Sequence, residues 1–128
     1  MEVGDYIIVG SNVVKITRYE VELQGKTALV DGKNPNITID DEVLKASGFV
    51  KINDSAAYKC ILKDDAGNVK YTVIFNPDTY VCEISRSIDM RPDFIQEIRV
   101  LSELQDFVRH KTGKELPIMM DKLAAIFK

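Results

Sequence analysis

Residues that carry chemistry are scarce in this sequence of 128 residues, which has no tryptophan, one histidine and two cysteines. It also lacks the GxxxxGK[ST], GxGxxG, GxSxG and HExxH motifs, so phosphate cradling, dinucleotide binding and zinc chemistry have no local support. The single histidine, His110, lies near Arg109, Lys111 and Lys114, and we interpret it as a solvated residue at a helix end. We therefore expect a non-enzymatic protein without a cofactor or a metal.

The sequence also lacks the long apolar runs of membrane and exported proteins. Its start, MEVGDYIIVG, carries Glu2 and Asp5 where a signal peptide carries basic residues, and no apolar segment reaches bilayer length. We expect a cytoplasmic protein without membrane contact. In that reducing compartment Cys60 and Cys82 form neither a CxxC pair nor a disulfide framework, so both are expected to be small core residues.

Neither sign of charge is in large excess, because 17 Lys and Arg oppose 20 Asp and Glu for a net charge of -3. This balance argues against a large phosphate-binding surface. Aromatic residues that could stack bases are assigned to the protein core instead, and we do not expect nucleic acid as a partner. These residues are Tyr58, Tyr71, Phe75 and Tyr80.

The composition, 45% hydrophobic and 29% charged, is typical of a globular protein, and the length fits one domain. The pattern of elements predicts an α+β fold over residues 1–128. It divides into an N-terminal strand ribbon (1–36), a short helix (37–49), a three-stranded antiparallel meander (56–86) and C-terminal helices (93–128).

Short β-branched segments at 5–9, 13–23 and 27–30, separated by glycine-containing turns, predict the N-terminal strands. Curling them into a small SH3-like antiparallel sheet would protect their edges. The stretch 31–36, DGKNPN, is expected to be a loop.

Residues 37–49 carry signals for both ends of a short helix. Asp40 is a suitable N-cap, Asp41 and Glu42 complement the helix dipole, and Gly48 can adopt the left-handed conformation at the end. The three consecutive acids could also be a metal site, but capping accounts for them at a helix start.

Apolar and polar residues alternate along three segments between residues 56 and 86, which predicts a sheet covered on one side only. One face is apolar and aromatic and the other is mixed. The apolar set is Tyr58, Cys60, Leu62, Tyr71, Val73, Phe75, Tyr80, Cys82 and Ile84.

A helix beginning near Asp93 is expected to cover that apolar face. Asp93 and Glu97 suit its start, and Gly113 suits its end. Its apolar stripe consists of Val100, Leu101, Leu104, Phe107 and Val108.

The last segment, 118–128, has Met119, Leu123, Ile126 and Phe127 on one side. This stripe can fold back onto the core or contact another chain. The methionines suit either outcome, because their side chains adapt to irregular surfaces.

The stretch IRVLSELQDFVRHKTGKEL, residues 98–116, resembles the closing motif of small uncharacterised proteins of Bacteroidetes and their phages. In that group a helix of the form I-x-Y-V-H-E-L-Q-x-L-Y ends in L-T-G-x-E-L. The segments Gly4-Asp5-Tyr6, 13–16 and 40–49 resemble earlier parts of the group's pattern. The matching residues of the closing motif are Ile98, Glu103, Leu104, Gln105, Thr112, Gly113, Glu115 and Leu116.

This sequence departs from the group's pattern at three kinds of position. Ser102 replaces the group's histidine, Val100 and Val108 replace its aromatic residues, and residues 117–128 extend beyond its usual end. The resemblance implies a phage or mobile-element setting and no reaction.

Two functional hypotheses follow. The first is a phage or mobile-element binding protein that acts in the bacterial host cytoplasm by contact with a protein partner or by homo-oligomer formation, through Met119, Leu123, Ile126 and Phe127. The alternative is an anti-defence sponge that sequesters a small nucleotide signal. Its phosphates would pair with Arg99, Arg109, Lys111 and Lys114.

Overall fold

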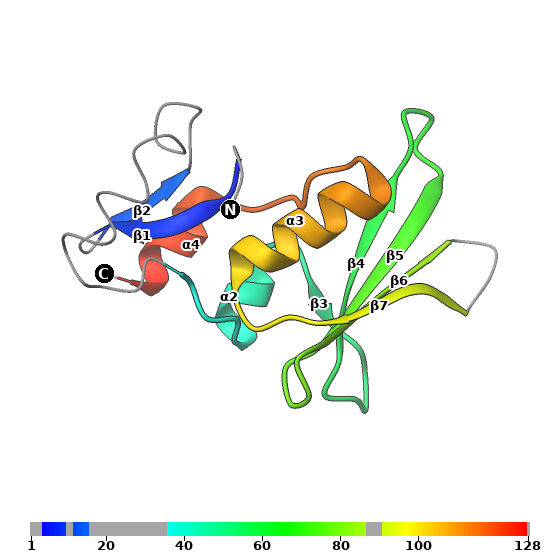
Figure 1. Ribbon diagram of the computed structural model, residues 1–128, viewed down its shortest axis with the longest axis horizontal. Coiled ribbons are helices and arrows are strands. Elements are labelled where there is room, and N and C mark those ends of the chain that lie inside the picture. Colours follow the sequence, from blue (N-terminus) through cyan, green and yellow to red (C-terminus); the bar gives the residue numbers. More distant parts are fainter. Residues whose placement is uncertain (1–3, 10–11, 16–35, 87–90, 128) are drawn as a thin grey trace.

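The computed structural model describes residues 4–9, 12–15, 36–86 and 91–127. Within these ranges the chain has an α+β fold with two antiparallel sheets (Figure 1). In chain order the elements are β1 Tyr6–Val9, β2 Asn12–Lys15, α2 Asp41–Ala46, β3 Val50–Lys51, β4 Tyr58–Lys63, β5 Val69–Asn76, β6 Val81–Arg86, β7 Pro92–Glu97, α3 Leu101–Thr112 and α4 Met120–Ile126.

The larger sheet has five antiparallel strands in the order β3-β4-β5-β6-β7. Strand β4 alternates strictly between buried and exposed residues, as expected for a sheet with one face in the core. That inner face contributes Cys60, Val73 and Ile84, each at most 2% exposed. Helix α3 lies between this sheet and the hairpin β1–β2 (Figure 1).

Strand β7 and the start of α3 correct the sequence prediction. The chain forms a strand at Pro92–Glu97 and begins its helix only at Leu101, so the expected helix start near Asp93 is wrong. The pairing of β7 with residues 81–85 of β6 favours the extended form, and Phe94 and Ile95 are residue types that suit strands.

The side chains assigned to the expected helix start have other roles. Asp93 forms an ion pair with Arg86 at 3.6 Å, Glu97 forms one with Arg99 at 2.7 Å, and Val100 is the extended residue that precedes the helix.

Helix α2 is shorter than predicted but begins as its residues require. The Asp40 carboxylate accepts a hydrogen bond of 2.9 Å from the Val43 backbone N–H, which confirms Asp40 as the N-cap. Gly48 has a φ of 88°, as expected for the left-handed residue after a helix. Residues 37–39 are not helical, because their backbone pairs with residues 99–101 just before α3.

The hairpin β1–β2 is fixed to α3 by polar groups. The buried Gln105 side chain accepts a hydrogen bond from the Tyr6 N–H at 2.8 Å and donates one to the Gly4 carbonyl at 3.0 Å. Arg109 donates to the fully buried carboxylate of Asp5 at 3.1 Å. The same guanidinium reaches Asp106 at 3.1 Å and Glu115 at 2.6 Å. We call Asp5, Gln105, Arg109 and Glu115 the hairpin clamp.

The predicted SH3-like strands are only partly described. Residues 6–9 and 12–15 form the expected antiparallel pair, whereas the remainder of the expected strand at 13–23, the strand at 27–30 and most of the loop at 31–36 lie outside the described residues.

The last helix, α4, folds back onto its own chain. Leu123 is fully buried, and Ile126 and Phe127 pack against the same core. The Met119 N–H donates to the Ala46 carbonyl at the end of α2, at 2.7 Å. Helix α4 therefore packs mainly against α2 and β2, and of the two C-terminal helices α3 is the one that lies beside the five-stranded sheet.

Helices in the described ranges all fall short of the length and apolarity that crossing a bilayer requires.

The hairpin clamp predicts an unequal effect of two arginine substitutions. Arg109→Met removes the guanidinium that pairs with the fully buried Asp5 carboxylate and should lower the free energy of unfolding by about 3 kcal/mol. Arg86→Met, whose ion pair is mostly exposed, should cost less than about 1 kcal/mol. Urea unfolding followed by circular dichroism measures both values, and equal small losses would contradict the structural importance of the clamp.

Candidate interaction surface

The four cationic residues proposed as an anion site do not line one pocket. Arg109 belongs to the hairpin clamp, with three carboxylates around it. Arg99 lies over the ring of Tyr80 at 4.5 Å and pairs with Glu97. Lys111 lies over Phe94 at 5.1 Å, and Lys114 lines a separate pocket beside β4. The geometry does not bring them together around one phosphate.

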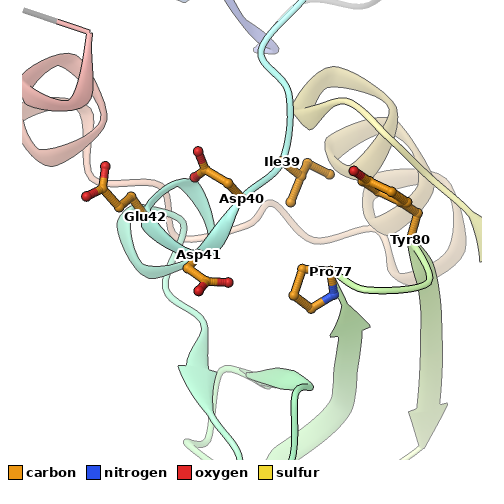
Figure 2. Close-up of a pocket in the computed structure, with 6 residues that line it drawn as sticks. All are labelled: Ile39, Asp40, Asp41, Glu42, Pro77 and Tyr80. Carbon is orange, nitrogen blue, oxygen red and sulfur yellow. The ribbon is translucent and has the colours of Figure 1, made fainter.

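Figure 2 shows the pocket of about 370 Å³ at the start of α2, lined by Ile39, the three consecutive acids, Pro77 and Tyr80. The carboxylates point in different directions, with Asp41 turned toward Pro77 and Glu42 turned away from it. Asp40 caps α2. Burial, followed by the charge of Asp41 and a hydrogen bond with it, raises the pKa of Tyr58. At least two of the acids thus have local structural partners, and no group of metal-binding side chains occurs in the described ranges.

Tyr80 stands in this pocket in an unusual backbone conformation, with a φ of 60°. It belongs to the turn before β6 rather than to the inner face of the sheet, which corrects its sequence assignment. Its N–H donates to Asn76 at 2.8 Å and its carbonyl accepts from Ile98 at 2.7 Å. These two bonds hold the strained residue, and the second one joins this turn to the segment that leads into α3.

The pocket of about 320 Å³ between β7 and α3 contains the only histidine. Its lining combines cationic and acidic groups, among them Glu103, Asp106, His110 and Lys111. His110 is exposed near the end of the helix. The mixed charges give this pocket no clear preference for a charged ligand.

The two thiols lie in the core, as predicted. Cys60 is 2% exposed and Cys82 is fully buried. Burial raises the pKa of Cys60 to about 11, and burial with the nearby charge of Glu83 raises the pKa of Cys82 to about 12. Neither sulfur supplies a thiolate nucleophile at neutral pH.

The stripe proposed for contact with another chain is largely used within this one. Leu123 lies in the core, and Ile126 and Phe127 are packed against it. Only Met119, at 37%, remains substantially exposed among the four residues. The sequence left two alternatives for this segment, and the structure supports folding back.

The outer face of the five-stranded sheet presents a different apolar surface. We define this outer face by residues on the side opposite α3, where no described element covers the sheet (Figure 1). Val50 is 64% exposed, Ile61 44% and Ile95 61%. Ile74 and Val81 are partly exposed on the same side. Directly opposed residues of neighbouring strands share a face. The register from β3 to β7 therefore places all five of these residues on the same side of the sheet.

Only part of this outer face is evident from the pattern of the sequence. The alternation identified Ile61, Ile74 and Val81 as members of the mixed side, but Val50 and Ile95 belong to β3 and β7, which were not predicted. Strand-forming residue types at 94–95 after Pro92 were the available signal.

Comparisons with protein-family models, curated proteins and solved structures find no match to this chain. The family resemblance therefore stays a prediction. The residues that carry it have structural partners in this fold: Gln105 and Glu115 belong to the hairpin clamp, and the Thr112 hydroxyl donates to the Val108 carbonyl at 2.6 Å.

The buried thiols lead to a prediction about labelling. At pH 8 a pKa of about 11 instead of 9.0 lowers the thiolate fraction about 100-fold. Folded protein should therefore react with a chromogenic disulfide reagent at least about 100-fold more slowly than protein unfolded in urea. Rapid reaction of either thiol in the folded protein would contradict its core position.

The same shifts predict a loss of stability in alkali. The unfolded thiols ionise near pH 9, whereas the folded thiols keep their protons until about pH 11 or above. Their contribution is complete below pH 9 and decreases as pH rises through 11. The midpoint of urea unfolding, measured between pH 8 and 11, should fall more in the wild type than in Cys60→Ala/Cys82→Ala; equal falls would contradict the assignment to these thiols.

Proposed function

We propose that this chain is a non-enzymatic binding protein that acts by protein–protein contact through the outer face of its five-stranded sheet. The exposed aliphatic side chains on that face carry the proposal. In this account the contact takes place in a bacterial host cytoplasm, the gene has a phage or mobile-element origin, and the N-terminal strands continue into an SH3-like sheet.

The composition of the outer face supports this proposal. A solvated face of an antiparallel sheet normally carries polar residues at alternate positions. Here each of the edge strands carries an exposed aliphatic residue on this side, Val50 on β3 and Ile95 on β7, and on β7 it is accompanied by Glu97. Full burial of one such side chain contributes about 1.5–3 kcal/mol, so contact with a partner would stabilise a complex.

β-Branched residues are common in strands because their side chains pack well on a pleated surface. Single exposed aliphatic residues are also ordinary on protein surfaces. The distribution distinguishes this face, because Val50, Ile61, Ile74, Val81 and Ile95 come from all five strands and lie on one side. Polar residues such as Lys59 and Glu83 lie between these aliphatic side chains, and a mixed aliphatic and polar surface of this kind is typical of non-obligate protein interfaces.

The nucleotide sponge has weaker support. Its four cations are spread over separate places, and Arg109 is already paired with carboxylates. We do not propose it as a second function.

Site-specific photo-crosslinking in the native cell tests the proposed contact. A benzophenone amino acid replaces Ile61 on the outer face, or Met120 on α4 as the control, which is 36% exposed against 44% for Ile61. We expect a discrete adduct of defined mass from position 61 and none from position 120. No adduct at position 61, or the same adducts at both positions, would contradict the proposal.

A further inference from the structure

One row of side chains crosses the outer face from edge to edge. The register pairs Val50 with Lys59, Lys59 with Ile74, Ile74 with Glu83, and Glu83 with Ile95. Because opposed residues point to the same side, these five side chains form a line perpendicular to the strands. We call it the cross-strand row.

The cross-strand row has a symmetric chemical order. Ile74 is at its centre on β5, with cationic Lys59 on one side and anionic Glu83 on the other. Aliphatic Val50 and Ile95 form its two ends, 64% and 61% exposed. On each side of Ile74 the row has first a charged residue and then an aliphatic one. The charged residues, Lys59 and Glu83, have opposite signs, and the aliphatic residues are Val50 and Ile95.

From this order we infer that the partner of the outer face is a second copy of this chain, packed face to face about a twofold axis along β5. This inference rests on the proposed contact function. The axis lies between the two sheets, so it places β4 of one copy over β6 of the other. Lys59 then faces the second copy's Glu83, Ile74 faces its equivalent, and Val50 faces the second copy's Ile95.

The charges make this arrangement self-complementary. Two Lys–Glu pairs form at once, one on each side of the axis, and a twofold interface repeats every favourable contact. Sheets that pack face to face lie about 10 Å apart with mean strand directions within about 30° of each other, and an axis along β5 keeps the two central strands parallel. Lysine and glutamate side chains are long enough to meet across that distance.

Pairing between the edges of two sheets fits the sequence less well. On the edge strand β7, Pro92 lacks a backbone N–H, and Asp93 and Glu97 carry charge. Proline and charged residues are common devices that prevent edge-to-edge association. The opposite edge, β3, has only two residues.

The size of the face sets the expected affinity. Strands β4 to β7, of six to eight residues each, and the two-residue β3 span about 20 Å by 20 Å, so two such faces bury on the order of 1,000 Å². This is the low end for specific interfaces, and we expect a reversible dimer at micromolar concentrations.

Charge reversal tests the inference, with sedimentation equilibrium of the full chain from 1 to 200 µM as the measurement. Wild type should approach twice the chain mass of 14.4 kDa at high concentration. Lys59→Glu or Glu83→Lys places like charges together and should weaken the dimer at least about 10-fold. The double variant Lys59→Glu/Glu83→Lys restores opposite charges and should recover dimerisation.

Lys122→Glu makes the same charge change on an exposed residue of α4 and should leave dimerisation unchanged. Circular dichroism confirms that every variant is folded. Monomeric wild type at 200 µM, or a double variant no better than the single variants, would overturn self-pairing.

The two proposals fail differently. A wild-type monomer with a position 61 crosslink to another protein would overturn self-pairing and leave the contact function in place. A wild-type monomer with no crosslink would overturn both.

Discussion

Helix α3 is buried on two sides, and the rest of the described structure depends on this constraint. One side places Leu101, Leu104 and Val108 in the core, all fully buried. The neighbouring side carries Gln105 and Arg109, one helical turn apart, which hold the hairpin β1–β2 through backbone groups and the buried Asp5. A regular amphipathic helix would need only the first side. The second side explains why polar residues of this helix are buried.

The packing of α3 determines which surfaces of the protein stay exposed to solvent. The helix closes the inner face of the sheet, and α4 packs against α2 and β2 instead of supplying a second cover. The outer face consequently keeps its aliphatic residues in contact with solvent. The apolar stripe at 119–127 is a less suitable contact surface, because Leu123 lies in the core and its neighbours pack around it. We therefore propose the outer face of the five-stranded sheet, rather than α4, as the surface that contacts a partner.

Hydrophobic alternation and residue type predicted those parts of the fold that depend on interactions between residues close together in the sequence. Alternation located the segments that become β4, β5 and β6, and the capping role of Asp40 and the left-handed Gly48 and Gly113 were evident from residue type.

Strand β7 was missed because its apolar residues also suit an amphipathic helix, and only pairing with β6 decides between the two. Tyr80 was placed in a strand because its positive φ depends on contacts with Asn76 and Ile98. The cross-strand row could not be foreseen, since its members come from five strands whose register the sequence does not state.

Hydroxyl-radical footprinting at 1 and 200 µM tests most directly whether the outer face pairs with a second copy of this chain. Self-pairing through the outer face should decrease the oxidation of Val50, Ile61 and Ile95 at the higher concentration, while oxidation of Met119 and Met120 on the C-terminal segment stays the same. Equal oxidation of the three aliphatic residues at both concentrations, measured under the same radical dose, would contradict it.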